Sequence, residues 1–496
     1  MDIMVEEVVR KDNLRASVWF WSVVGLFTTL WVLLPTLLHT SYCGDVIEVQ
    51  NIGPEWVWAT KKHPMLPAWI LETLNILTCR SFAVPFIATQ VCTLLALWSV
   101  WRLARTVLDE RLALVAAFSV LPYLFFTCKP IWFNQNNVLI AFWALSIYFV
   151  FQAVQTNQKR YWITAGVALG LAFHAKYPTL FLCIAIVIYM LTQENGRKYF
   201  RTPGPWITIL IVFTIFLPHI IWLFHHDFVT FQYASNRVPM LQWLSPLGFI
   251  GGQLLYWLLT LVILIPVIGF AWQWKSRHPE QGKTRECQSF LLFCAVIPAA
   301  LLVLYGGIQG KYIPMEYGAP LWTFGGLWLL LRFQTKEPIQ CFHQAVTLTI
   351  TIMFFIAAGF ATEFYLGLQH PKHYRPMHAL GTVCEQLWCS HVSNAQCPYI
   401  AGDDLLLVGH VAHAMPLRPS VIMPQGTWAD DSDLNNKGGM IVWEIKNGER
   451  AMPESLHSRF SKAKVLLETP ELPYKVGNKV LTLKLGIAIV PPSAGQ

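Results

Sequence analysis

Residues 18–45 read VWFWSVVGLFTTLWVLLPTLLHTSYCGD, a long apolar run followed by a short polar stretch that ends in a carboxylate. The apolar part, Val18–Leu38, is long enough to cross a bilayer, which takes about 20 helical residues. Asp45 follows it, and Lys61-Lys62-His63-Pro64 comes later in the same loop. Charges beside a bilayer are costly unless they have partners or a function. A carboxylate can act as a base and a lysine can hold a phosphate, so this loop is the first candidate site.

The composition indicates a membrane protein. The mean hydropathy is +0.45, 55% of the residues are hydrophobic and only 13% are charged, against roughly 25% charged residues in soluble domains. The formal charge of +8 does not indicate a nucleic-acid partner, because the basic residues are scattered through short loops. Such scatter is typical of the positive-inside pattern of membrane proteins.

Apolar runs along the chain predict about eleven transmembrane helices. They are Val18–Leu38, Ala83–Trp101, Leu112–Phe126, Val138–Phe151, Tyr161–Phe173, Tyr177–Leu191, Trp206–Phe224, Leu247–Trp272, Phe290–Tyr305, Tyr317–Leu331 and Ala345–Phe360. Several are shorter than a full span and must extend into their polar flanks. The weakest is Tyr161–Phe173, because only three residues separate it from the next run.

Loop charges predict the orientation. Basic residues are more frequent in alternate loops, beginning with Arg10, Lys11 and Arg15 before the first span, so we expect a cytoplasmic N-terminus. The first run lacks a small-residue cleavage site and is long, which indicates an anchor that is retained. An odd number of spans puts the tail on the opposite side. We therefore expect a multi-pass inner (plasma) membrane protein, with residues 1–365 as a transmembrane domain, residues 39–81 as its first external loop, and residues 366–496 as a periplasmic soluble domain.

The tail is more polar and carries short β-like runs. These are Leu405–Val408, Met440–Trp443 and Val465–Leu467, and the segments 402–404 and 435–439 read as turns. A length of about 130 residues predicts one small α/β domain. Two of its three cysteines, Cys384, Cys389 and Cys397, are able to pair if that side of the membrane is oxidising.

The remaining candidate polar residues fall in external loops. The first loop holds Asp45, Glu48, Lys62 and His63, and later turns hold Lys176, Tyr177, Asp227, Arg237 and Lys311. Because all these loops are on one side of the predicted membrane, we expect residues far apart in the sequence to converge there.

The order of these motifs resembles the lipid-linked-sugar glycosyltransferases of the GT-C fold, and in particular the protein-mannosyltransferase-like (family 39) and aminoarabinose-transferase-like (family 83) enzymes. The matching segments are 42–45, Trp56-Val57-Trp58, 62–69, 133–137, 165–177, 218–231, 311–320 and 400–404. Two departures stand out. Asp45 is followed by Val46 where the family often has Asp-Glu, and Asn136 and Asn137 stand where the family tends to have an acid.

The resemblance implies an inverting transfer of a sugar from a polyprenyl-phosphate donor to an extracytoplasmic acceptor. Asp45 would be the general base, with Glu48 as the second carboxylate. Lys62 would be the main ligand of the donor phosphate, with Lys176 and Arg237 as helpers. His63, Tyr177, Asp227 and Lys311 would contact the substrates. The resemblance implies no definite cofactor, and a divalent metal is left open, although Asn136 and Asn137 argue against a metal-binding role.

Three functions remain open at this stage. The acceptor of an enzyme of this kind is lipid A, lipopolysaccharide or another glycan, or alternatively a protein that is O-mannosylated. A lipid or sugar flippase, or a transporter, is the alternative of another class. Transporters tend to carry charges near the midplane and internal repeats, whereas most charges here lie at the ends of the runs and no repeat is visible.

Overall fold

The computed structural model describes residues 2–123, 125–127, 131–235, 245–268, 282–310, 312–333, 338–392, 396–423, 426 and 428–492. The chain divides into two compact units. The membrane unit comprises Met1–Leu33 and Phe86–Ala358, and the loop–tail unit comprises Leu34–Pro85 and Gly359–Gln496. The loop at residues 39–81 thus groups with the tail. Its external location and the predicted domain boundary at residues 365 and 366 stay predictions.

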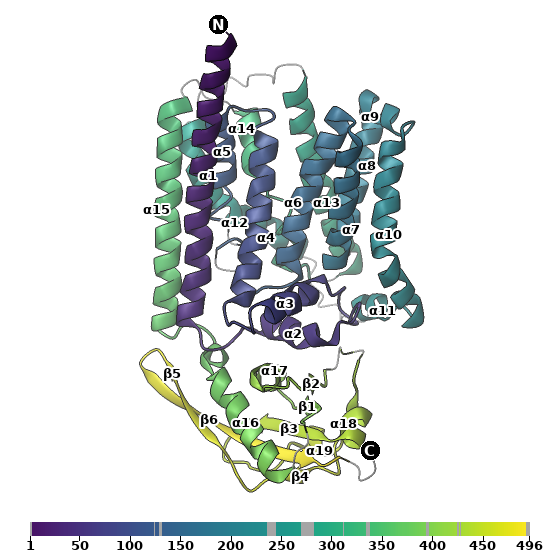
Figure 1. Cartoon of the computed structure of the whole chain (residues 1–496), viewed down its shortest axis with the longest axis vertical. Coiled ribbons are helices and arrows are strands. Elements are labelled where there is room, and N and C mark those ends of the chain that lie inside the picture. The colour runs from purple at the N-terminus through teal and green to yellow at the C-terminus, as the bar shows by residue number, and fades with distance from the viewer. Residues whose placement is uncertain are drawn as a thin grey trace. The chain divides into compact units, whose positions relative to one another are not determined.

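The membrane unit is helical (Figure 1). Its helices are α1 (Asp2–Leu38), α4 (Val84–Ala104), α5 (Glu110–Phe118), α6 (Gln135–Thr156), α7 (Lys159–Ala175), α8 (Thr179–Thr192), α9 (Glu194–Tyr199), α10 (Pro203–His225), α11 (Val229–Ser235), α12 (Ser245–Ile268), α13 (Lys283–Gln309), α14 (Gly325–Arg332) and α15 (Pro338–Tyr365), with the 3₁₀ turn η2 (Met315–Gly318). Within the described residues, seven are long and apolar enough to cross a membrane: α1, α4, α6, α10, α12, α13 and α15. The protein is a multi-pass membrane protein, as predicted.

Two predicted spans are shorter than expected. The run Leu112–Phe126 forms a helix only as far as Phe118, and turns follow up to Tyr123. The run Tyr317–Leu331 becomes α-helical only at Gly325. Pro122 explains the first limit, because a proline lacks a backbone donor and disfavours a helical residue before it. In the second run, turn residues 321–324 separate Pro320 from α14. Helices α5 and α14 pack against each other.

Small residues let two neighbouring helices approach closely. A side-chain carbon added to Gly166 of α7 would lie 2.9 Å from Cβ of Ile211 in α10, and one added to Gly170 would lie 3.0 Å from Cβ of Ile215. Glycines spaced in this way are common where membrane helices pack. The short α7, predicted as the weakest span, is therefore held tightly between α6 and α10 (Figure 1).

The loop–tail unit combines helices with a six-stranded mixed sheet. The loop forms α2 (Gly44–Ile52), η1 (Gly53–Glu55) and α3 (Leu66–Leu77), and the tail helices are η3 (Pro371–Tyr374), α16 (Met377–His391), α17 (Leu405–Ala414), α18 (Asp431–Lys437) and α19 (Glu454–His457). The strands are β1 (Tyr399–Ala401), β2 (Ser420–Val421), β3 (Gly439–Glu444), β4 (Lys464–Val465), β5 (Glu471–Val476) and β6 (Lys479–Val490), in the order β2-β1-β3-β6-β4 with β5 also paired to β6. Strand β1 is parallel to β2 and β3, and the other pairs are antiparallel.

The small α/β domain predicted for the tail is confirmed, but some of its elements were assigned wrongly. Strand β3 contains the predicted run Met440–Trp443. The run Leu405–Val408 is helical instead, because Asp404 caps the helix by accepting a hydrogen bond from the Leu406 N–H. Residues 435–437 end α18, and only Gly438, with φ of 84°, makes the turn. Cys384, Cys389 and Cys397 all carry free thiols in this structure.

Candidate active site

The loop places Asp45 in the first turn of a short helix. Tyr42 and Cys43 are buried before it, while the Asp45 side chain is exposed. The carboxylate lies at the amino end of α2, where the helix dipole favours negative charge. Asp45 is therefore an anchored, solvent-accessible carboxylate, which is what a general base requires.

Glu48 and Lys62 form an ion pair beside Asp45. Glu48 lies one turn further along α2, and residues three apart in a helix share a face. Lys62 Nζ lies 2.9 Å from Glu48 Oε1 and 3.1 Å from Oε2. The Lys62 N–H donates to Thr60 Oγ1, and the Thr60 N–H donates to the His63 carbonyl, which fixes a tight turn. The loop thus brings together Asp45, Glu48 and Lys62, with the half-buried His63 in the same turn.

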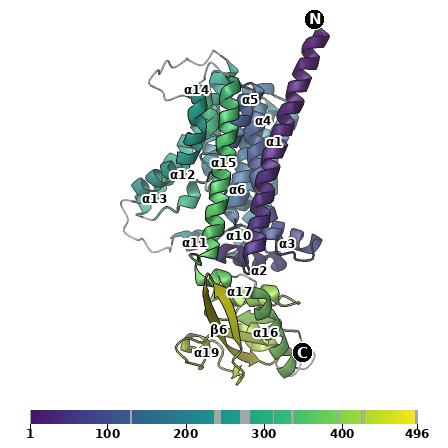
Figure 2. The same ribbon diagram turned by 90° about the vertical axis from the view of Figure 1, so that its left-hand side faces the viewer.

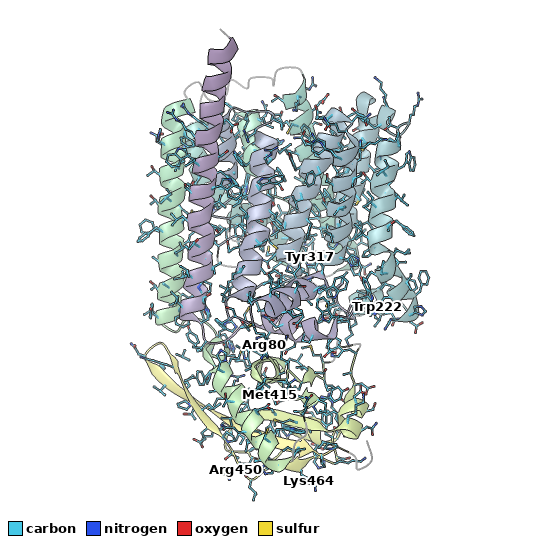
Figure 3. The ribbon with its side chains drawn as sticks, viewed as in Figure 1. Arg80, Trp222, Tyr317, Met415, Arg450 and Lys464 are labelled. Carbon is cyan, nitrogen blue, oxygen red and sulfur yellow. The ribbon has the colours of Figure 1, made fainter. Side chains whose placement is uncertain are left out.

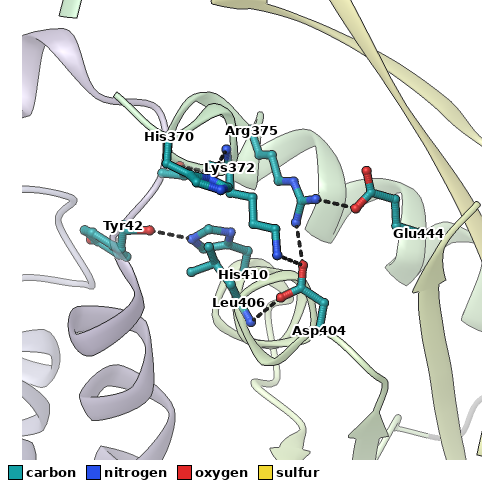
Figure 4. Close-up of polar contacts among 9 residues, drawn as sticks. Tyr42, His370, Lys372, Arg375, Asp404, Leu406, His410 and Glu444 are labelled. Carbon is teal, nitrogen blue, oxygen red and sulfur yellow. Dashed lines mark hydrogen bonds and ion pairs between the residues drawn. The ribbon is translucent and has the colours of Figure 1, made fainter. Parts of the chain in front are cut away.

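A helix of the tail packs against the buried face of this loop. Helix α17 packs on α2, where a side-chain carbon on Gly409 would lie 2.8 Å from Asn51 Nδ2 and 2.9 Å from Ile47 Cγ1. His410 Nε2 donates to the Tyr42 carbonyl oxygen at 2.8 Å, three residues before Asp45 (Figure 4). Burial lowers the pKa of His410 to about 4, although its bond to Tyr42 opposes the shift. His410 is therefore neutral at neutral pH, with its proton on Nε2.

A buried ion pair ties the end of the loop to the tail. Arg418 NH1 contacts both oxygens of Glu72 in α3, at 3.0 and 2.8 Å, and NH2 donates to the Gln50 carbonyl at 2.6 Å. The exposed fractions of the two side chains are 11% for Arg418 and 9% for Glu72. One arginine thus binds the two loop helices together.

We expect Arg418→Met to destabilise the folded protein by about 3–5 kcal/mol, since it leaves the Glu72 carboxylate buried without its partner. The measurement is the free energy of unfolding, or the unfolding midpoint, of the purified protein in detergent. Arg450→Met, at an exposed arginine of the same unit (Figure 3), is the matched control and should change little. The double variant Glu72→Met/Arg418→Met should recover most of the loss. Equal midpoints for Arg418→Met and Arg450→Met would contradict this role.

A second ion-pair network braces the start of the tail (Figure 4). Arg375, 2% exposed, donates from NH1 to Asp404 at 3.0 Å and from NH2 to Glu444 at 2.7 Å, and Lys372 also contacts Asp404 at 3.0 Å. Burial would raise the pKa of Asp404, but the hydrogen bonds from Lys372 and Arg375 outweigh it and hold the pKa below its usual value. Because Asp404 also caps α17, this network fixes the helix that packs on the loop.

The membrane unit carries a separate polar cluster around Lys176. Its side chain is 5% exposed, and Nζ donates to Asn136 Oδ1 at 2.8 Å and lies 3.9 Å from the centre of the Tyr317 ring (Figure 3). Asn136 opens α6, Lys176 follows α7, and Tyr317 belongs to η2. Three turns that are far apart in sequence therefore converge on one lysine.

Tyr177 and two histidines extend this cluster. The Tyr177 hydroxyl lies 2.9 Å from His219 Nε2, and His219 follows the helix-breaking Pro218 inside α10. His174 contacts the Ile215 carbonyl at 2.9 Å, next to the backbone that the proline disrupts. The residues on either side of Lys176 thus contact α10 around Pro218.

The other predicted site residues are placed differently. Asp227 is exposed in the turn after α10, with φ of 48° and its carbonyl oxygen bonded to Gln232. Arg237 and Lys311 lie outside the described residues. The part of the chain that the structure describes contains no group of three or more His, Cys, Asp or Glu side chains that could hold a metal ion.

Sequence reasoning did not find Gly409, His410, Arg418 and Glu72, which position the loop. One signal was present, because Asp404 is followed by Leu407, Val408, Val411 and Ala412 at helical spacing. That pattern identifies a helix with one fully buried face, although it does not identify its partner.

Solved structures with the same fold identify the fold class. The chain superimposes on the crystal structure of ArnT from Cupriavidus metallidurans bound to undecaprenyl phosphate with a TM-score of 0.61 and 11% identity, over 97% of this chain and 99% of that one. The apo structure of the same enzyme matches with a TM-score of 0.59 and 10% identity, over 96% and 98% of the two chains. The predicted GT-C-type fold, with its membrane helices and small C-terminal domain, is confirmed.

Two sequence matches then indicate the class of enzyme that the chain resembles. The dolichyl-phosphate-mannose-protein mannosyltransferase family matches residues 62–222. The lipid A galacturonosyltransferase RgtD of Rhizobium johnstonii is 23% identical over 204 residues, which is 41% of this chain and 42% of that protein. The match thus spans about two fifths of the length of the curated relative. The predicted resemblance to glycosyltransferases that use lipid-linked sugars is confirmed.

Proposed function

We propose that this protein is an integral-membrane glycosyltransferase that moves a sugar from a polyprenyl-phosphate donor to an extracytoplasmic acceptor with inversion. The observation that carries the proposal is the fold match along 97% of the chain to an enzyme whose structure holds undecaprenyl phosphate. The family match at residues 62–222, which includes Lys62 and Lys176, supports it independently.

In the proposed reaction, Asp45 takes the proton of the acceptor hydroxyl. The hydroxyl oxygen attacks the anomeric carbon and forms the new glycosidic bond, while the bond from that carbon to the phosphate oxygen breaks on the opposite face. The phosphate leaves with the electron pair as an anion and needs no proton. One carboxylate is therefore sufficient, in contrast to glycoside hydrolysis, which uses a pair.

Cations stabilise the leaving phosphate in this scheme. The Glu48 carboxylate, 2.9 Å from Lys62, offsets much of the charge of that lysine. We therefore give Glu48 the role of positioning Lys62, and give Lys176 the larger share of phosphate binding, with Arg237 as a further cation. His63, Tyr177, Asp227 and Lys311 are proposed substrate contacts.

Lipid A or lipopolysaccharide is our preferred acceptor, supported by the match to a lipid A galacturonosyltransferase. Protein O-mannosylation is the second candidate, supported by the description of the matching family. Mass spectrometry of lipopolysaccharide and of exported proteins, from cells with and without this chain, separates them. A sugar lost from lipid A supports the first acceptor, and a sugar lost only from proteins supports the second. Donor movement across vesicles without any transfer would instead support a flippase.

We expect the N-terminus in the cytoplasm and the tail, from about residue 366, in the periplasm. The reason is the excess of Lys and Arg in alternate loops. An alkaline phosphatase fused after Gln496 should be active, and one fused after Lys283 should be inactive. A cytoplasmic reporter at the same two positions is the control and should give the reverse result. Activity of the phosphatase at Lys283 alone would contradict this orientation.

A further inference from the structure

Two membrane helices end at the same place in the loop–tail unit. The apolar spans of α1 and α15 end at Leu38 and Tyr365. The His39 ring, directly after α1, lies 5.1 Å from the Phe364 ring, and its Nε2 lies 3.1 Å from Gln369 Oε1. Both apolar spans thus stop just before residues 366–369.

The turn of the β5–β6 hairpin contacts residues 366 and 367, which directly follow α15. A side-chain carbon on Gly367 would lie 2.8 Å from the Gly477 nitrogen, and one on Gly477 would lie 2.8 Å from the Leu366 carbonyl oxygen. Both glycines have positive φ, of 68° and 56°, so each is needed for its backbone conformation as well as for the close contact. The hairpin turn, which leads into β6 (Figure 2), is thus held against the residues that directly follow α15.

The side chains around this contact are apolar and basic. Leu366 is 62% exposed, Leu368 is 69% exposed and Val480 is 70% exposed. Lys475 pairs with Val480 across the hairpin, and Lys479 begins β6; both lysines are exposed. Exposed apolar side chains flanked by lysines are typical of segments that lie in the headgroup region of a membrane.

We propose that the tip of the β5–β6 hairpin, together with Leu366 and Leu368, rests in the headgroup region of the bilayer and binds anionic phospholipid headgroups through Lys475 and Lys479. Continuity with α15 supports a lipid partner, because a surface that starts where a span ends lies against lipid. The exposed Glu363, on α15 itself, carries a charge that opposes this binding. This contact is separate from sugar transfer, and it anchors the tail at a second point beside the membrane.

The test measures the depth of a nitroxide spin label on Val480→Cys in nanodiscs. Lys464→Cys is the matched control, because Lys464 pairs with Ile489 at the opposite end of β6 (Figure 3), about 30 Å away at ~3.3 Å per residue. Both are made in a chain with the exposed Cys79 and Cys389 changed to Ser, and the signal of that parent is subtracted. We expect collisions with oxygen to exceed those with a water-soluble nickel chelate by several-fold at 480, and the reverse at 464.

A second measurement tests the charge. In nanodiscs of phosphatidylglycerol the label at 480 should lie deeper than in phosphatidylcholine, and Lys475→Gln/Lys479→Gln should remove that difference. Water-like accessibility at 480 in both lipids would overturn the proposal. Dipolar broadening between labels on two copies would also overturn it, because it would identify a second protein chain as the partner.

Discussion

Asp45→Asn is expected to lower the rate of sugar transfer by at least about 10²-fold, while the protein inserts and folds normally. Asparagine keeps the size and hydrogen-bonding shape of aspartate but cannot take the acceptor proton, and a general base contributes about 10²–10⁴-fold. The side chain is exposed at the start of α2, so the substitution removes no buried contact. Transfer is measured with purified protein in detergent, a polyprenyl-phosphate sugar and the acceptor found by mass spectrometry.

Glu48→Gln is the matched control, because Glu48 lies on the same helix and also carries a carboxylate. It should cost less than Asp45→Asn, since it only frees Lys62 from its ion pair. Full activity of Asp45→Asn with loss in Glu48→Gln would reverse the two roles. Full activity of both would refute the proposed first-loop mechanism.

Lys176→Met is expected to lower kcat by about 10²–10³-fold, the usual effect of removing one preorganised group that stabilises developing charge. Methionine preserves much of the apolar stem of a side chain that is 5% exposed, so the variant should still fold. The charge on the phosphate grows as it leaves, which is why kcat should fall more than donor affinity. Turnover and KM for the donor are measured over a range of donor concentrations.

Variants of two other lysines serve as comparisons for Lys176→Met. Lys159→Met, at an exposed position at the start of α7, should change neither kcat nor KM. Lys62→Met should cost less than Lys176→Met, because the charge of Lys62 is already offset by Glu48 at 2.9 Å. A larger loss for Lys62→Met than for Lys176→Met would return the main phosphate role to Lys62.

The membrane architecture was largely predictable, since an apolar run such as Trp206–Phe224 has one stable solution in a bilayer, a spanning helix. The end of α5 was less predictable, because hydropathy does not register a proline, here Pro122, that stops a helix inside an apolar run. In the tail, the short apolar run Leu405–Val408 fits either a strand or a buried helix. The run is helical because Asp404 caps it by accepting a hydrogen bond from the Leu406 N–H.

It was predictable that turns far apart in sequence converge, but their particular contacts were not predictable. Lys176 was expected to meet residues from other turns, and the structure joins it to Asn136 and Tyr317. No local pattern identifies Glu48 as the partner of Lys62, or Arg418 as the partner of Glu72. Those contacts depend on how separate segments pack in three dimensions, and Glu72 and Arg418 are separated by most of the chain.

The grouping of residues 34–85 with residues 359–496 has a consequence for how the protein is made. The ribosome finishes the loop early, and roughly 270 further residues must follow before its partner segment starts, which takes about 14–55 s at ~5–20 residues per second. During that interval Glu72 and the inner face of α2 lack Arg418 and α17. A chain cut short before Arg418 would therefore insert into the membrane with an unsupported loop, and we expect quality-control proteases to remove it.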